Sequence, residues 1–217
     1  MNAKISEIFY SLQLEGSFIG YPAIFIRFSG CNLNCDFCDT KYALDEGIKK
    51  NKEEIYERIK RFNTKRIIFT GGEPALYDDF MADFMKTYYD YEYFIETNGT
   101  IFIEQSIKKL KHIVVSPKFF AIDEDVLNLF NKHSNSVEFK FIIDNEDDIK
   151  QTERLTDKLK LKNITLQPLF DNDKPIEQYI KKTAKIIELF KKSNLTNKNA
   201  RLIIQNQKII YNQQRGV

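Results

Sequence analysis

Three cysteines, the only ones in the chain, lie within eight residues: Cys31, Cys35 and Cys38. Their spacing, C-x3-C-x2-C, places three thiols close together in one loop. Thiolates are the usual ligands of iron–sulfur clusters and frequent ligands of zinc. An odd number of cysteines excludes a framework made only of internal disulfides. A tight cluster of this kind is typical of a metal site in a reducing compartment.

Three thiolates can hold three irons of a four-iron cluster and leave the fourth iron without a protein ligand. An open metal position is where a small molecule can bind and react. The alternatives are a zinc site completed by His112 or His133, and three unrelated free thiols. Neither histidine has a ligand-like spacing to the cysteines, so the open cluster is the favoured interpretation.

Further polar groups follow apolar stretches of the chain. Thr70-Gly71-Gly72-Glu73-Pro74 combines paired glycines, which let the backbone approach a ligand closely, with a carboxylate suited to a cation or an ammonium group. Similar groups are Glu96-Thr97-Asn98-Gly99, Ser116-Pro117-Lys118 and Gln167-Pro168. Each alone is more typical of a turn. Because α/β folds place their sites at the carboxyl ends of parallel strands, the four together predict one ligand-binding face.

The elements that would position these groups are seven apolar strands and four helices. Predicted strands are Ala23–Phe28, Arg66–Phe69, Tyr93–Glu96, His112–Ser116, Glu138–Ile143, Ile164–Gln167 and Arg201–Ile204. Predicted helices are Lys52–Phe62, Phe80–Tyr88, Asp123–Asn131 and Pro175–Lys192, the last with a buried stripe of Ile176, Tyr179, Ile180, Thr183, Ile187 and Phe190. Continuous apolar runs that alternate with helices indicate a buried parallel sheet. Seven strands in 217 residues fit a partial (β/α) barrel better than a complete one, which needs about 250 residues.

Composition favours one globular α/β domain over residues 1–217, because no linker rich in Gly, Pro or Ser divides the chain. Lys plus Arg number 33 and Asp plus Glu 31, a balance that argues against direct nucleic-acid binding. No run of 18 apolar residues predicts a membrane span, and the N-terminus lacks the apolar stretch of a signal peptide. We therefore expect a cytoplasmic protein without a membrane partner.

The cysteine motif, with Phe37 before the last cysteine, resembles the signature of the radical S-adenosylmethionine superfamily, and GGEP resembles its motif for the methionine amino group. The opening EIFYSLQLEG, the segment F-x-R-x-x-GCNL-x-C-x-F-CDT and the ending QNQK with Arg215-Gly216-Val217 are similar to the 7-carboxy-7-deazaguanine synthase family of the queuosine (7-deazapurine) pathway. The resemblance implies a reduced (β/α) partial barrel, usually a homodimer. A radical SAM core would carry a substrate-binding N-terminal loop and a C-terminal tail.

The same resemblance implies a carbon–nitrogen lyase. The reaction would contract the ring of 6-carboxy-5,6,7,8-tetrahydropterin to 7-carboxy-7-deazaguanine and release ammonia. It would use a 4Fe–4S cluster, S-adenosylmethionine, Mg2+ and an external electron donor. Reductive cleavage of S-adenosylmethionine would give a 5′-deoxyadenosyl radical that takes a hydrogen from the substrate, so no side chain is assigned as catalytic.

The resemblance also assigns roles to residues, beginning with the cluster on Cys31, Cys35 and Cys38. Contacts to S-adenosylmethionine are expected from Phe37, Asp39, Gly72, Glu73, Asn98, Ser116, Pro117, Lys118 and Gln167. Contacts to the substrate are expected from Leu12, Gln13, Leu14, Glu15, Arg27, Thr70, Gln207 and the carboxylate of Val217. The Thr40 hydroxyl would bind Mg2+, since hard cations prefer oxygen. The Arg27 fork suits the pterin carboxylate, while Gln13 and Glu15 can read the amide and amino edge.

Three positions depart from that family: Leu14 stands where glycine is usual, Gln207 where histidine is expected, and Phe37 where tryptophan is common. Two other functions share part of the pattern. One is a radical SAM activase that installs a glycyl radical on a partner protein, which would not carry the Q-x-E-G-like opening or the Arg-Gly-Val ending. The other is a non-catalytic metal-binding or interaction module, which iron and sulfide analysis would separate.

Overall fold

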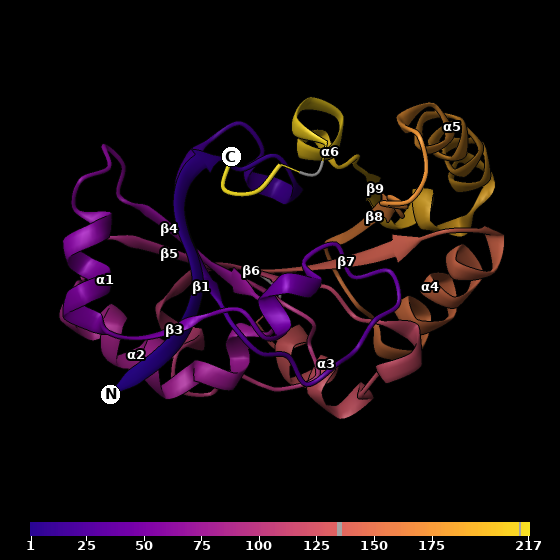
Figure 1. Ribbon diagram of the computed structural model, residues 1–217. Coiled ribbons are helices and arrows are strands. Elements are labelled where there is room, and N and C mark those ends of the chain that lie inside the picture. Colours follow the sequence, from indigo (N-terminus) through magenta and orange to yellow (C-terminus); the bar gives the residue numbers. More distant parts are fainter. Residues whose placement is uncertain (134–135, 213) are drawn as a thin grey trace.

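The computed structural model describes residues 1–133, 136–212 and 214–217. Within these residues one sheet has the strand order β3-β1-β2-β4-β5-β6-β7-β8-β9 (Figure 1). The strands are β1 (Asn2–Leu12), β2 (Pro22–Phe28), β3 (Ile48–Asn51), β4 (Arg66–Gly71), β5 (Glu92–Thr97), β6 (Leu110–Val115), β7 (Val137–Ile143), β8 (Ile164–Pro168) and β9 (Arg201–Leu202). β1 pairs antiparallel with β2 and β3, and every pairing from β2 to β9 is parallel. Since β3 and β9 remain as edges, the sheet is a partial barrel.

The helices that connect strands along the chain pack against one side of the sheet. They are α1 (Lys52–Ile59), α2 (Asp78–Thr87), α3 (Glu124–Asn131), α4 (Glu146–Leu159) and α5 (Ile176–Lys192). Helix α6 (Asn206–Tyr211) follows β9. Helices α2 and α3 lie below the sheet in Figure 1, whereas α6 and the C-terminus lie above it. No helix in the described part of the chain is long and apolar enough to span a membrane.

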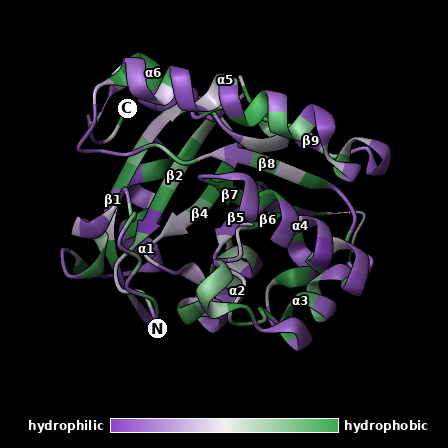
Figure 2. Ribbon diagram, turned by 90° about the vertical axis from the view of Figure 1, so that its right-hand side faces the viewer, coloured by the Kyte–Doolittle hydropathy of each residue, from purple (hydrophilic) through white to green (hydrophobic). Residues whose placement is uncertain are grey.

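The main core lies between the sheet and these helices. Ile24, Ile26 and Phe28 of β2, and Phe139 and Phe141 of β7, are fully buried in it. They occupy alternate positions because successive side chains of a strand point to opposite faces. The intervening positions face the other side of the sheet, where a smaller apolar cluster contains Ala23, Phe25, Ile68 and Phe94. Figure 2 shows hydrophobic strands between helices that carry hydrophilic residues.

The seven predicted strands and four predicted helices are confirmed, with bounds that differ by a few residues. One detail of α5 is wrong. Tyr179 and Thr183 are buried as expected, but Ile186 takes the place of Ile187 in the buried stripe. Ile180 is 55% exposed and Ile187 38% exposed. The predicted stripe was therefore too wide, and two of its isoleucines face solvent.

Among the strands and α-helices of the described residues, four were not predicted: β1, β3, α4 and α6. The alternation of β1 is interrupted by a bulge between Ile5 and Glu7, which hides its period of two. Helix α4 buries Thr152 and Thr156 beside its few apolar residues, so its buried face does not stand out in the sequence. Its start is nevertheless marked by a capping box. The Asn145 side chain accepts from the backbone N–H of Asp147 at 2.8 Å and of Asp148 at 3.3 Å.

Replacing the cap tests how much it stabilises the domain. Asn145→Ala removes both side-chain bonds and should lower the free energy of unfolding by about 1 kcal/mol, measured by urea denaturation. Gln151→Ala, at an exposed position of the same helix, is the control and should change it by less than about 0.5 kcal/mol. Equal effects of the two variants would refute the role of the cap.

Candidate active site

The inner face of the sheet, away from the main core, carries polar side chains near the ends of its strands. They are Arg27 of β2, Thr70 of β4, Glu96 of β5, Lys140 of β7 and Gln167 of β8. The strand register places Arg27 directly beside Thr70. All five side chains line the same cavity. The carboxyl ends of the parallel strands thus form one polar face, as predicted.

The cavity has a volume of about 320 Å³, and small-molecule sites usually measure about 300–1,000 Å³. The predicted site residues that line it are Leu12, Gln13, Leu14, Glu15, Arg27, Cys31, Cys35, Phe37, Cys38, Asp39, Thr40, Thr70, Gly72, Asn98, Ser116, Lys118, Gln167, Gln207 and Val217. The two predicted residues outside the lining are Glu73 and Pro117. The loop after β1 and the C-terminal residue therefore meet the cysteine loop and the strand ends in one place.

The three cysteines are half-buried free thiols in the loop after β2. The Cys31 Sγ accepts the backbone N–H of Leu33 at 3.4 Å, and the Cys38 Sγ lies 3.8 Å from the Thr40 hydroxyl. Burial, as the largest cause, raises the pKa of Cys31 and of Cys35. Both thiols are therefore protonated at neutral pH, and a metal that binds them must displace their protons.

Neither histidine completes a metal site with these thiols. His112 Nε2 lies 3.1 Å from Glu138 Oε2, the His133 ring packs near Phe102, and neither histidine lines the cavity. Among the described residues no group of three His, Cys, Asp or Glu is arranged around a single ion. A four-iron cluster takes each thiolate on a different iron and so needs a wider spacing than one ion does. The zinc alternative with a histidine ligand is not supported.

Two glycines at the end of β4 let this segment pack against the cysteine loop. A Cβ on Gly72 would lie 2.1 Å from the carbonyl oxygen of Gly30 and 3.2 Å from the Cβ of Cys31. Gly71 has a positive φ of 143°, and a Cβ there would lie 2.3 Å from the carbonyl oxygen of Phe28. Only glycine permits this approach.

Glu73, the next residue, is fully buried and holds the neighbouring backbone. Its carboxylate accepts from the backbone N–H of Ala75 at 2.8 Å and of Asn98 at 2.7 Å, and from the Thr97 hydroxyl at 2.6 Å. Burial is the largest effect on this carboxyl and raises its pKa. In this structure Glu73 joins the ends of β4 and β5 and does not face the cavity, so its predicted contact with a ligand remains a prediction.

Lys118 and Asn98 line the cavity close to the cysteine loop. Lys118 Nζ donates to the Ser116 carbonyl at 2.6 Å and to its hydroxyl at 2.9 Å, and burial lowers the pKa of Lys118 to about 8. Asn98 Nδ2 lies 3.9 Å from Cys31 Sγ and donates to Asn32 Oδ1 at 3.0 Å. These strand-end residues therefore provide donors next to the thiols.

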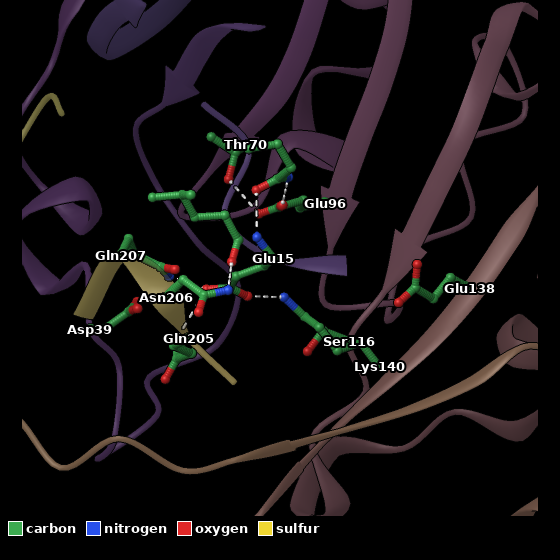
Figure 3. Close-up of polar contacts among 12 residues, drawn as sticks. Glu15, Asp39, Thr70, Glu96, Ser116, Glu138, Lys140, Gln205, Asn206 and Gln207 are labelled. Carbon is green, nitrogen blue, oxygen red and sulfur yellow. Dashed lines mark hydrogen bonds and ion pairs between the residues drawn. The ribbon is translucent and has the colours of Figure 1, made fainter. Parts of the chain in front are cut away.

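Glu15, in the loop after β1, is the centre of a polar cluster shown in Figure 3. Its Oε2 lies 2.5 Å from Lys140 Nζ, and its Oε1 accepts from Gln205 Nε2 at 3.2 Å and also from Gln207 Nε2. Burial alone would raise the pKa of Glu15, but Lys140 and the two amides hold it below its usual value. The carboxylate is therefore ionised. Leu14 lines the cavity beside it, and the Leu14 carbonyl accepts from Asn206 Nδ2 at 3.2 Å.

A second acid, Glu96, joins Gln13 to Thr70, and Glu96 and Thr70 are labelled in Figure 3. Gln13 Nε2 donates to Glu96 Oε1 at 2.8 Å, and the Thr70 hydroxyl donates to Glu96 Oε2 at 3.4 Å. Gln13 Oε1 in turn accepts the backbone N–H of Glu15 at 3.1 Å. The loop after β1 is thus hydrogen-bonded to the strand ends, and carboxylate and amide groups are displayed in the cavity.

Phe37, Asp39 and Thr40 belong to the cysteine loop and line the cavity on the side of the C-terminal segment. Phe37 is 36% exposed and its ring packs near Phe120. The Thr40 hydroxyl donates to Asp39 Oδ1 at 3.3 Å, and Asp39 Oδ2 lies 3.7 Å from Lys208 Nζ. These groups supply oxygen ligands and a cation next to the thiols.

Comparisons with known proteins agree with this geometry. Residues 25–166 match the model of the Radical SAM superfamily. The chain is 32% identical to the 7-carboxy-7-deazaguanine synthase of Clostridium acetobutylicum, over 100% of both chains. It is 45% identical to that of Bacteroides thetaiotaomicron over 119 residues, which are 54% of this chain and 62% of that relative. The crystal structure of QueE from Escherichia coli is similar with a TM-score of 0.73 over 94% of each chain, at 26% identity. The chain belongs to the 7-carboxy-7-deazaguanine synthase family of the radical SAM superfamily.

Membership in the radical SAM superfamily implies a 4Fe–4S cluster and S-adenosylmethionine as cofactors. The donor set fits both. Three thiols without a fourth cysteine or histidine in the lining suit a cluster with one open iron. The close approach at Gly72 brings backbone groups to the rim of the same loop, where a polar ligand of that iron would lie.

Several lining residues of this radical SAM protein were not assigned from the sequence, chiefly Lys140, Gln205 and Lys208, and Glu96 was predicted only as part of the strand-end group Glu96-Thr97-Asn98-Gly99. A signal existed for one of them. Lys140 and Glu138 are charged residues two positions apart in the apolar strand VEFKFII, so they must share the face opposite to its phenylalanines. Gln205 and Lys208 belong to a C-terminal segment whose position depends on tertiary contacts.

The buried pair of Lys140 and Glu15 can be tested without any cofactor. Lys140→Met leaves the Glu15 carboxylate buried without its cation and should lower the free energy of unfolding by about 3–5 kcal/mol in urea denaturation. Adding Glu15→Gln should recover much of the loss, because the uncompensated charge is gone. Lys158→Met, which removes an exposed pair with Glu124, is the control and should cost about 0–1 kcal/mol. A loss at Lys140 no larger than at Lys158 would contradict a buried ion pair.

Proposed function

We propose that this protein is a 7-carboxy-7-deazaguanine synthase, which contracts 6-carboxy-5,6,7,8-tetrahydropterin to 7-carboxy-7-deazaguanine and releases ammonia. One observation carries the proposal. A single cavity is lined by the three thiols of the cluster motif and also by a guanidinium, amides and carboxylates that suit a carboxylated pterin. The small volume of that cavity supports a small-molecule substrate.

The residues of the chain would bind and orient the reactants. Cys31, Cys35 and Cys38 would hold the cluster, with S-adenosylmethionine along Asn98, Lys118 and the other predicted cofactor contacts. When bound, these two cofactors supply the carbon-centred radical that takes a hydrogen atom from the substrate. Arg27 would bind the pterin carboxylate, since a planar fork matches a carboxylate.

The rest of the pocket would recognise the heterocycle. The ionised Glu15 and the Glu96 carboxylate accept hydrogen bonds, which suits the N–H groups of a pyrimidine edge, while Gln13 offers both donor and acceptor atoms. Val217 would bring the terminal carboxylate to the same pocket, as its place in the lining allows.

Four further features belong to the same proposal. The Thr40 hydroxyl would bind Mg2+, with substrate and water as other ligands. An external donor would supply the electron. The protein would act in the cytoplasm as a homodimer, in which exposed apolar side chains such as Ile209 and Ile210 of α6 could be covered. Light scattering on the purified protein would test the dimer.

The function is tested by anaerobic incubation of the reconstituted protein with S-adenosylmethionine, a reductant, Mg2+ and the carboxypterin, followed by mass spectrometry. The expected product is 7-carboxy-7-deazaguanine together with ammonia and 5′-deoxyadenosine. Cofactor cleavage without conversion of the pterin would reject this substrate while retaining the radical SAM chemistry.

The cluster assignment predicts that each thiol is necessary. Changing Cys31, Cys35 or Cys38 to Ala should abolish cluster binding and product formation, because the chain has no other cysteine. Iron and sulfide content and the visible spectrum measure the first effect, and the product assay the second. Asp36→Asn, at an exposed position of the same loop outside the cavity lining, should keep both. Full cluster content in any cysteine variant would reject that ligand.

Arg27 should be sensitive to a substitution that preserves its charge. Arg27→Lys loses the fork, and breaking a hydrogen-bonded charge pair typically costs about 2–5 kcal/mol. We expect the KM for the carboxypterin to rise at least about tenfold, while cluster content and cofactor cleavage stay near normal. An unchanged KM with an intact cluster would show that the carboxylate binds elsewhere.

A further inference from the structure

Glu7 of β1 lies directly opposite Arg27 in the antiparallel pairing of β1 with β2. Its Oε2 lies 3.0 Å from Arg27 Nε. Both side chains are largely enclosed, with exposed fractions of 20% for Glu7 and 15% for Arg27. Arg27 lines the cavity, whereas Glu7 does not. The carboxylate of Glu7 therefore stands behind the arginine as seen from the cavity.

The contact uses one particular nitrogen of the guanidinium. Glu7 binds at Nε, and neither terminal nitrogen of Arg27 has a hydrogen-bond partner among the described residues. The Arg27 Cζ lies 5.7 Å from the centroid of the Phe9 ring and 5.9 Å from that of Tyr42. A guanidinium has five donors in a rigid plane. Holding it at Nε between two rings fixes that plane and leaves the two terminal nitrogens for another acceptor.

Tyr42 controls where Glu7 can bind. Its hydroxyl donates to the same Oε2 of Glu7 at 2.8 Å. Burial, and after it the bond to Glu7, raises the pKa of Tyr42 to about 12, so the hydroxyl keeps its proton at neutral pH. A free carboxylate next to an arginine would prefer the bidentate position on the terminal nitrogens. The Tyr42 hydroxyl opposes this by holding Oε2 on the Nε side.

The same ring also receives the C-terminal tail. The Arg215 Cζ lies 3.5 Å from the centroid of the Tyr42 ring, and Arg215 Nη1 lies 2.9 Å from Glu46 Oε2. Arg215 is two residues from Val217, which lines the cavity. Tyr42 thus contacts the tail through its ring and the Glu7–Arg27 pair through its hydroxyl.

We propose that Glu7 and Tyr42 are positioning residues, which hold Arg27 with both terminal nitrogens free for the carboxylate of the substrate while the ring of Tyr42 seats the C-terminal tail. This inference rests on the proposed function, because the carboxylate belongs to the proposed pterin. It adds that the carboxylate subsite is built from three segments: the strand pair β1–β2, the end of the cysteine loop and the tail.

Steady-state kinetics with the reconstituted full-length protein test the inference. Glu7→Leu removes the acceptor behind Arg27 and should raise the KM for the carboxypterin on the order of tenfold, the scale of one hydrogen bond to a charged group. Glu7→Gln retains an oxygen at that place and should stay within about threefold. Tyr42→Phe keeps the ring for Arg215 but releases Glu7, and should raise the KM by about three- to tenfold. The value of kcat should change by less than about threefold in each.

Two readouts separate positioning from a general structural role. A tetrahydropterin that lacks the 6-carboxylate, used as a competitive inhibitor, should bind Glu7→Leu and wild type equally well. In an Arg27→Lys background, which has no Nε donor or fork, Glu7→Leu should add little to the KM, so the two effects should not be additive. Glu92→Gln, which alters the Arg66–Glu92 pair outside the cavity lining, should leave the KM unchanged.

The outcomes against the inference are distinct. A wild-type enzyme that converts the carboxypterin, combined with an unchanged KM in Glu7→Leu and Tyr42→Phe, would overturn the inference and leave the proposed function intact. Equal weakening of the carboxylate-free inhibitor would show a general disturbance of the pocket and would also overturn it. If Glu7→Leu fails to fold, Tyr42→Phe decides alone by the same measurements. A wild type that converts no carboxypterin would overturn both the proposed function and the inference.

Discussion

Side chains along a strand point alternately to the two faces of its sheet, and this constraint places the functional groups of the protein. In β4, Ile67 and Phe69 are fully buried in the main core, while Thr70 lines the cavity from the other face. In β7, Phe139 and Phe141 bracket Lys140 in the same way. The packing that stabilises a strand therefore also fixes the direction of its ligand-facing side chain. Groups held on such packed elements are positioned more accurately than groups on loops.

Charge on the inner face must be compensated, because an unpaired buried charge is costly. The structure compensates it with groups from distant segments. Lys140 pairs with Glu15, and the fully buried Glu138, two positions earlier on the same face, accepts from the Ser17 hydroxyl at 2.6 Å and lies 2.7 Å from Arg201 Nη2. Since Glu15 and Ser17 belong to one loop, Lys140 and Glu138 of β7 bind that loop at two places. The loop after β1 is thus positioned by buried polar contacts as well as by Phe18, whose ring packs against Phe94.

Much of this site could be predicted from local spacing. The cysteines lie in one loop, and the polar groups that follow apolar runs must meet at one edge of a parallel sheet. What could not be predicted is which side chains form hydrogen bonds and ion pairs with one another. Glu7 meets Arg27 only through the register of β1, a strand whose alternation is broken by a bulge. Glu73 has a residue type suited to a ligand, yet three short hydrogen bonds direct it to the backbone and the Thr97 hydroxyl. Such outcomes depend on which segments come together in space, and sequence patterns carry no information on that.

Two of the three positions expected to depart from the family, Leu14 and Gln207, meet in the same part of the structure. Leu14 contributes its carbonyl to a bond with Asn206, and the next residue of α6, Gln207, donates to Glu15. A glutamine amide can donate as histidine can, but it does not titrate near neutral pH. Because Glu15 is kept ionised mainly by Lys140, it needs a neutral donor from the tail and no second cation. The Gln207 amide therefore links the N-terminal loop to the C-terminal segment through a donor that does not titrate in the neutral range.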